Sequence, residues 1–269
     1  MDTSQFKGRH LFVAGGSSGI NFGIAQAFAR AGAKVTVMSR SADKVVSAAA
    51  QLQALGAQAI GIAADVRHPE AVQAAFAQAE ENFGPIDVLV SGAAGNFLAS
   101  ALDMSPNAFK TVVDIDLLGS FNVARLAHAH LRKPGACVIQ ISAGQSFIPT
   151  PFQAHVCAAK AGVDMLTQVL ALEWGAQGIR INSIVPGPIA DTEGLKRLAP
   201  GEDNLKAMAE RVPLKRLGKI EDIARMAMLL ASDWGSYITG AIIPVDGGLA
   251  LSGPRDFTAA AAASRREKA

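Results

Sequence analysis

The sequence from 14 to 23 reads Ala14-Gly15-Gly16-Ser17-Ser18-Gly19-Ile20-Asn21-Phe22-Gly23, and it stands between a short apolar run and a helical pattern over 24–31. Glycines let a backbone turn tightly and approach a pyrophosphate, and the free N–H groups at the start of a helix attract an anion. A strand, a glycine-rich turn and a helix in this order predict a dinucleotide-binding unit. A plain structural turn is the alternative. The residues predicted to contact the cofactor here are Gly15, Ser17, Ser18, Gly19 and Ile20.

Short apolar runs rich in Val and Ile alternate with Ala-rich segments of helical period. This is the pattern of repeated βαβ units, whose strands are buried on both faces of a parallel sheet. The predicted strands cover 10–14, 34–38, 59–63, 88–91, 136–141, 180–185 and 241–245. The fold class is therefore α/β, a single-domain Rossmann-like doubly wound sheet of about seven parallel strands flanked by helices. Right-handed crossovers place the carboxyl ends of such strands at one edge, where ligands bind.

The chain is expected to form one domain over residues 1–257. The polar segment 190–213, which contains Pro200-Gly201, interrupts the alternation and is predicted to be a mobile lid. Residues 258–269 are first Ala-rich and then charged, and they are predicted to be a flexible tail.

The formal net charge is +2 over 269 residues, with acids and bases interspersed. Such a chain offers no broad cationic face to nucleic acid or to a membrane, and its apolar runs fall short of the ~20 residues that a membrane span needs. Cys137 and Cys157 lack metal-ligand spacing, so we expect neither a disulfide nor a metal site. The N-terminus lacks the pattern of a secretory signal. These features predict a soluble cytoplasmic protein that binds neither nucleic acid nor membrane.

The end of the second predicted strand reads Met38-Ser39-Arg40-Ser41. An acid at this point would bond the ribose hydroxyls of NAD, whereas a cation accepts the additional phosphate of NADP. Arg40 offers a planar guanidinium for that phosphate, with Ser39 and Ser41 as hydroxyl donors. NADP(H) is therefore the predicted cofactor, and a solvated surface arginine is the alternative.

Gly15 and Gly19 match the T-G-x-x-x-G-x-G turn of the short-chain dehydrogenase/reductase family, with Ala14 in place of Thr and Asn21 in place of the last Gly. Asn tolerates a left-handed backbone better than most residues, so we expect the turn to form with Asn21. The resemblance extends from Gly8 to about Gly248. It implies that further residues contact the cofactor, namely Asp65, Val66, Ala93, Lys160, Pro186, Gly187 and Ile189.

Lys160 is similar to the lysine of the Y-x-x-x-K motif of this family, in which a tyrosine acts as the acid. Val156 stands four residues before Lys160, and Gln153 stands at the alternative spacing of seven. Ala143 falls where the family has its serine. The one tyrosine, Tyr237, lies far along the chain. Reduction of an ordinary carbonyl needs a proton at oxygen, so the departure argues against a simple ketone and favours conjugate reduction of an unsaturated thioester.

The same departures resemble the 2,4-dienoyl-CoA reductases, most closely the peroxisomal type. The similar segments are Ala93-Ala94-Gly95-Asn96-Phe97, Asp114-Ile115-Asp116, Pro186-Gly187-Pro188-Ile189 and Thr192-Glu193-Gly194-Leu195. The resemblance implies an NADPH-dependent reductase of acyl thioesters that assembles as a homotetramer.

The resemblance also implies roles at the site. Asp116 and Lys160 would orient a water that protonates the dienolate, and Asn96 would steady its oxygen. Phe97, Gln145 and His155 are predicted to contact the substrate. For Asp116 and Asn96 the alternatives are a satisfied buried carboxylate and a loop-capping amide. His155 is either an acid, because imidazole titrates near neutrality, or a packed and hydrogen-bonded side chain.

Two other functions remain open from the sequence. One is reduction of another carbonyl or 3-oxoacyl thioester, with water or His155 in place of the tyrosine. The other is a catalytically silent NADP-binding subunit.

Overall fold

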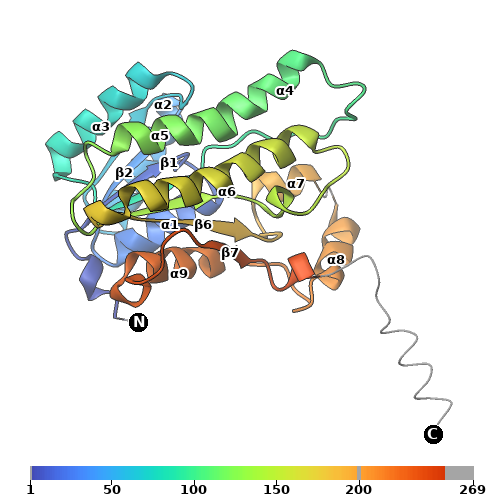
Figure 1. Ribbon diagram of the computed structural model, residues 1–269. Helices are drawn as coiled ribbons and strands as arrows, with labels where there is room; N and C mark the ends of the chain where they lie inside the picture. Colours follow the sequence, from blue (N-terminus) through green and yellow to red (C-terminus); the bar gives the residue numbers. More distant parts are fainter. Residues whose placement is uncertain (1, 199–200, 252–269) are drawn as a thin grey trace, which may run out of the picture.

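The computed structural model describes residues 2–198 and 201–251. All strands of the described chain lie in one parallel sheet in the order β3-β2-β1-β4-β5-β6-β7 (Figure 1). They are β1 His10–Ala14, β2 Lys34–Ser39, β3 Ala59–Ala63, β4 Val88–Ser91, β5 Cys137–Ile141, β6 Arg180–Pro186 and β7 Ile242–Val245. Every predicted strand is present and ends within one residue of its predicted bounds, so the predicted doubly wound α/β fold is confirmed.

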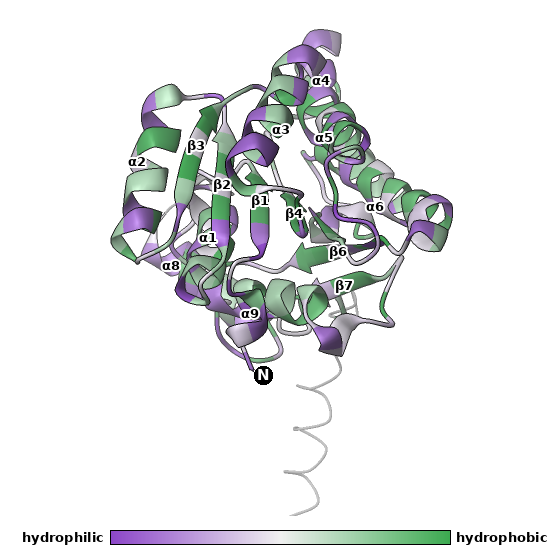
Figure 2. Ribbon diagram, turned by 90° about the vertical axis from the view of Figure 1, so that its left-hand side faces the viewer, coloured by the Kyte–Doolittle hydropathy of each residue, from purple (hydrophilic) through white to green (hydrophobic). Residues whose placement is uncertain are grey.

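The helices form a layer on each face of the sheet (Figure 1). One layer contains α1 Gly19–Arg30, α2 Ala42–Ala54 and α9 Ile220–Ala231, and the other contains α3 Pro69–Phe83, α5 Gly119–Ala127 and α6 Ala154–Trp174. Successive strand residues point to opposite faces. Val13 therefore packs in the core under α1, whereas Phe12 packs under α3. Figure 2 shows the strands largely in the hydrophobic colour, as expected for a sheet covered on both faces.

The register aligns the carboxyl ends of the central strands. Ala14 of β1 pairs with Met38 of β2 and with Ser91 of β4, and Ser91 pairs with Gln140 of β5. The loops that follow these strands consequently meet at one edge of the sheet. This edge receives most of the residues that the sequence selected.

Lys160 lies in the second turn of α6, which begins at Ala154. The segment 190–213, predicted to interrupt the alternation of strands and helices as a mobile lid, contains α7 Glu193–Leu198 and α8 Glu202–Arg211 in succession. Both helices are short, and the hydroxyl of Thr192 accepts a hydrogen bond from the Leu195 N–H at the start of α7. Movement of this segment stays a prediction.

The predicted tail, 258–269, lies outside the described residues. Within residues 2–198 and 201–251, no helix combines the length and the apolar character needed to cross a membrane. In the same part of the chain, no group of three His, Cys, Asp or Glu side chains could hold a metal ion.

Candidate active site

The glycine-rich turn after β1 lies against the loop that follows β4. Gly15 and Gly19 have φ angles of 77° and 59°, which favour glycine. A Cβ atom on Gly15 would stand 2.8 Å from the Ala93 nitrogen, whereas one on Gly19 would meet nothing within 4 Å. The turn therefore packs closely against Ala93 at Gly15 and leaves free space beside Gly19. Its open side leads to the start of α1, whose first N–H groups have no carbonyl four residues back within the helix.

Asn21 does not replace a left-handed glycine, as the sequence had suggested. It lies inside α1, and the described non-glycine residues with positive φ are Phe152, Asp191 and Lys215. The Asn21 Nδ2 donates instead to the Gly92 carbonyl at 2.8 Å and to the Gly15 carbonyl at 3.3 Å. The amide therefore ties the glycine turn to the loop after β4, a role that depends on hydrogen bonding rather than on backbone freedom.

The end of β2 carries polar and charged side chains at the same edge of the sheet. The Ser39 hydroxyl is buried and has no hydrogen-bond partner among the described residues, and Arg40 beside it is exposed. Ser41 is less available than predicted, because its hydroxyl accepts from the Lys44 N–H at the start of α2. An orphaned hydroxyl next to an exposed guanidinium is the donor set that a phosphate requires.

Asp65 and Val66 lie after β3, at the adjoining part of the same edge. Arg67 holds the Asp65 carboxylate at 2.6 Å and lowers the pKa of that carboxyl, so Asp65 is an anion already paired. Val66 is buried, and its carbonyl accepts from the Asn122 amide.

β6 ends at Pro186 at this edge, and the N–H of Gly187, the next residue, donates to the Val245 carbonyl. Ile189, which the resemblance placed at the cofactor, is 3% exposed and packs in the core under α9. Its side chain therefore faces the protein interior, and its backbone is the part left to face a ligand.

The structure brings Asp116 and Lys160 together as predicted. The Lys160 Nζ lies 3.5 Å from the Asp116 Oδ2, and the two side chains are 6% and 1% exposed. Nζ also donates to the Ile141 carbonyl at 3.0 Å, while the Gly95 N–H donates to the Asp116 Oδ1 at 2.7 Å. Burial raises the pKa of Asp116, and Lys160 and the Gly95 N–H oppose this effect. The two groups form an ion pair that the surrounding protein almost completely buries.

Asp116 reaches this position from a π-helical turn, Asp114–Leu118, between α4 Pro106–Val113 and α5. Such turns insert one extra residue into a helix and are frequent at functional sites. The Ser120 hydroxyl donates to the Asp116 carbonyl, which the widened turn presents to it. Nothing in the hydrophobic pattern of this segment indicated the turn.

Asn96 is held between two fixed neighbours. Gly95 before it is bound by Asp116, and the Phe97 carbonyl after it accepts from the Gln153 Nε2 at 2.7 Å. The Asn96 Oδ1 is itself buried without a partner in the described chain. That oxygen can only accept a hydrogen bond, so a contact of Asn96 with a ligand oxygen would have to come from its Nδ2.

His155 lies against the same segment. Its ring packs against that of Phe97 at a tilt of 32°, with the centroids 4.2 Å apart, and its side chain is fully buried. Neither ring nitrogen has a hydrogen-bond partner among the described residues. The Phe97 carbonyl nevertheless lies near enough to act on the pKa of the ring, so the packed histidine and the substrate contact both stay predictions.

Gln145 lies in the short 3-10 turn Gly144–Ser146, half-buried and packed near α6. Val156, at the tyrosine position, is buried, and Tyr237 is fully exposed before β7. The site therefore contains no phenol of this chain.

Three polar residues at the site escaped the sequence reasoning. Gln153 was noted only because it is not a tyrosine, yet it positions Phe97. Gln140 is fully buried with both amide atoms unpaired in the described chain, and the Ser142 hydroxyl is buried in the same state. A polar residue inside a predicted buried strand was the signal that could have indicated Gln140 and its neighbour.

Comparison with known proteins agrees with this geometry. Residues 14–250 match the family model described as enoyl-(acyl carrier protein) reductase. The chain is 45% identical to a peroxisomal 2,4-dienoyl-CoA reductase [(3E)-enoyl-CoA-producing] of Pongo abelii, over 91% of this chain and 85% of that protein. It is 43% identical to the protein of the same name from Arabidopsis thaliana, over 93% and 87%. The crystal structure of a short chain dehydrogenase from Bacillus anthracis has a TM-score of 0.83 and 34% identity, covering 93% of this chain and 100% of that chain.

The prediction of a cytoplasmic protein is wrong. Both of these relatives are named as peroxisomal, which points to the peroxisome rather than the cytoplasm. That prediction rested on composition and on the N-terminal sequence pattern. Neither feature distinguishes the cytoplasm from the interior of a peroxisome.

The match covers most of the chain, and the glycine turn, the sheet order and the position of Lys160 agree with it. An oxidoreductase activity follows from the family. The chain therefore belongs to the short-chain dehydrogenase/reductase family, whose Rossmann-like fold binds a nicotinamide cofactor.

Proposed function

We propose that the protein is an NADPH-dependent 2,4-dienoyl-CoA reductase. The observation that carries the proposal is the buried Asp116–Lys160 pair in a site of this family that has no phenol. Without a phenol to protonate an alkoxide, the site is suited to a substrate whose negative charge delocalises and is quenched at carbon. The names of the relatives supply the substrate class.

NADPH, when bound, would supply the hydride that adds to the far end of the conjugated system. The π electrons then shift toward the thioester, so the charge rests on its oxygen and on the second and fourth carbons. Asn96 would donate a hydrogen bond to that oxygen. Asp116 and Lys160 would orient the water that gives one proton to carbon, and the hydroxide left behind would regain a proton from solvent through this pair. Lys160 would also hold the ribose of the cofactor.

The position of that proton decides the product. Protonation of the second carbon leaves a 3-enoyl thioester, and protonation of the fourth leaves a 2-enoyl thioester. We propose the (3E)-enoyl product that the names of the two relatives carry.

The direct test follows NADPH absorbance after addition of 2,4-hexadienoyl-CoA or acetoacetyl-CoA. Oxidation of NADPH with the dienoyl thioester alone supports the proposal, and product analysis by NMR locates the double bond. Turnover of acetoacetyl-CoA alone would show a 3-oxoacyl reductase instead. NADPH binding without turnover of either thioester would show a silent subunit.

For the cofactor, we propose NADP(H) because Ser39 and Arg40 are placed for its additional phosphate. An Arg40→Glu variant is expected to bind NADPH ~100-fold more weakly, since it replaces a charge-assisted contact with a repulsion. Fluorescence titration with NADPH and NADH measures the change. NADH affinity should not fall, because NADH has no such phosphate and an acid at this point can bond its ribose hydroxyls. An equal loss for both cofactors would contradict the assignment.

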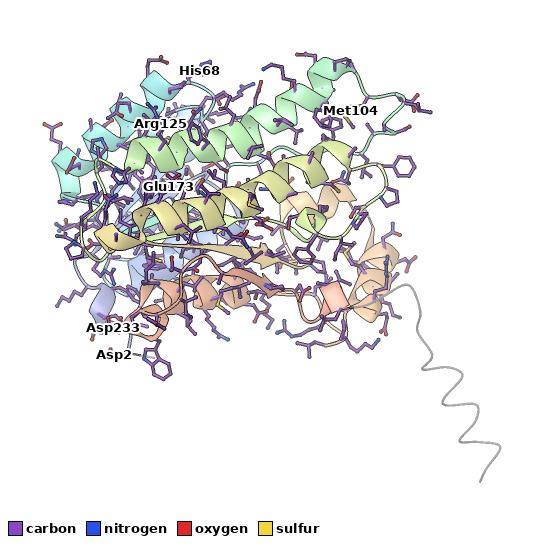
Figure 3. All side chains as sticks on the ribbon, viewed as in Figure 1. Asp2, His68, Met104, Arg125, Glu173 and Asp233 are labelled. Atoms are coloured by element: carbon purple, nitrogen blue, oxygen red, sulfur yellow. The ribbon has the colours of Figure 1, made fainter. Side chains whose placement is uncertain are left out.

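We propose a homotetramer as the assembly. Large apolar side chains stay exposed on the outer side of the helices that follow β4 and β5: Phe109, Leu118, Phe121, Met165, Val169 and Leu172. Charged side chains, including Arg125 of α5 and Glu173 of α6, lie on the same helix pair (Figure 3). Such a mixed patch is typical of subunit interfaces, and the mass in solution from light scattering tests the proposal.

A further inference from the structure

The site contains one chemically capable side chain that the proposed mechanism does not use. His155 is the first polar residue inside α6, directly before Val156 at the tyrosine position. It is fully buried, and both of its ring nitrogens lack partners among the described residues. Buried polar groups are nearly always hydrogen-bonded, so two orphaned nitrogens on one ring require an explanation.

The position of the ring supplies that explanation. It packs against the Phe97 ring with the centroids 4.2 Å apart, and Phe97 follows Asn96 directly in the chain. Asp116 lies close enough to influence the titration of the imidazole. The imidazole therefore lies beside the segment that carries Asn96, and on the same helix as Lys160, the partner of Asp116.

We propose that the His155 imidazole donates an N–H hydrogen bond to the thioester oxygen of the bound substrate, so that it acts with Asn96 as the second donor to the dienolate. This inference rests on the proposed function. It assigns to His155 the stabilising hydrogen bond that the absent phenol cannot make, while the proton at carbon still comes from water.

The ring is expected to act in its neutral form. Burial lowers the pKa of His155, whereas the Phe97 carbonyl and the Asp116 carboxylate oppose this effect. That carbonyl already accepts from Gln153, and Asp116 is paired with Lys160 on the same helix as His155. A neutral imidazole is a hydrogen-bond donor that can stabilise a developing enolate without giving up its proton.

Phe97 covers the ring. Phe97 is 37% exposed, whereas the imidazole beneath it is fully buried. A substrate reaches His155 when the Phe97 ring moves aside. The acyl chain of the substrate then covers the imidazole in place of the Phe97 ring. Displacement of the cover thus exposes the donor only in the presence of a substrate.

Two matched variants test the role. His155→Phe keeps an aromatic ring for the stack with Phe97 but removes the donor, and kcat for 2,4-hexadienoyl-CoA is expected to fall by about 10²–10³-fold, the loss typical of one oxyanion donor. His155→Gln keeps an amide N–H and is expected to stay within about 10-fold of the wild type. NADPH affinity should be unchanged in both variants.

A second readout is independent of turnover. In the wild type, the ¹⁵N signals of His155 should report a neutral ring at pH 7, and one N–H proton should shift downfield when hexanoyl-CoA and NADP⁺ are added. A His155→Phe variant within threefold of the wild-type kcat would overturn the inference. So would a rate that rises as the pH falls through protonation of the ring, because that behaviour identifies a general acid.

Failure of the proposed function itself is distinguishable. In that case, wild-type protein would not oxidise NADPH with the dienoyl thioester at all. Failure of the present inference would leave wild-type turnover intact and the variants equally active.

Discussion

A Lys160→Met variant is expected to lose kcat by about 10²–10⁴-fold, the range in which positioned acid–base groups contribute. Asp116→Asn should lose a similar amount. The two side chains lie 3.5 Å apart in a site where both are almost fully buried. If they hold one water together, removing either partner removes the function of both. The Asp116→Asn/Lys160→Met double variant should therefore be no slower than the single variants, as for residues that act as a unit.

The double variant also controls for folding. Removing one partner of a buried ion pair leaves an uncompensated charge, which typically costs ~3–5 kcal/mol of stability. The double variant leaves no charge and should unfold closer to the wild type in urea. If instead the kinetic losses of the single variants multiply in the double variant, the two residues act separately and the shared-water mechanism is wrong.

The pH profile gives the sign of the effect. Burial raises the pKa of Asp116, so the ionised carboxylate is lost as the pH falls through a value above that of an ordinary aspartate. If the ionised form orients the water, kcat/KM should decline on this acid side. Asp116→Asn should remove that decline together with most of the rate.

A Gly15→Ala variant is expected to lose both stability and cofactor binding. Gly15 has a φ of 77°, and an added Cβ would lie 2.8 Å from the backbone nitrogen of Ala93. The contact is with backbone, which cannot move aside without shifting the loop after β4. We expect ~1–2 kcal/mol from the left-handed conformation and a further ~1–3 kcal/mol from the overpacking. NADPH affinity should fall as well, because the turn would no longer present its N–H groups.

Gly8 provides a control with the same backbone conformation. Its φ is 76°, and a Cβ atom there would meet nothing within 4 Å. Gly8→Ala should therefore show the conformational cost alone and bind NADPH normally. Urea unfolding and fluorescence titration of both variants measure the difference. Equal losses in the two variants would mean that contact with Ala93 contributes nothing.

The sheet could be predicted almost completely from the sequence. Strands such as β1 and β4 are buried on both faces, so their sequences are short apolar runs with clear ends. Asp116 and Lys160 could also be identified, because a family pattern fixes their spacing. For both, the information lies in short segments of sequence.

The errors concern residues whose roles depend on distant partners. Gln153 bonds to Phe97, 56 residues away, and the Asn21 amide bonds to Gly92, 71 residues away. Neither contact leaves a trace in local periodicity or propensity. The reasoning about Asn21 considered its backbone, whereas the structure uses its side chain.

The π-helical turn at Asp114–Leu118 fixes how α4 is rotated about its axis relative to α5. Residues of an α-helix advance by about 100° each, with a rise of ~1.5 Å. Deleting one residue from this turn would restore a regular helix, but it would swing α4 by about a quarter of a revolution relative to α5. If α5 kept its place, Phe109 of α4 would rotate away from the exposed apolar side chains of α5. If α4 kept its place, Asp116 would rotate away from Lys160. The additional residue of the π-helical turn thus fixes the rotation of the exposed apolar surface relative to the buried Asp116 carboxylate. An insertion or a deletion there would misalign one of the two.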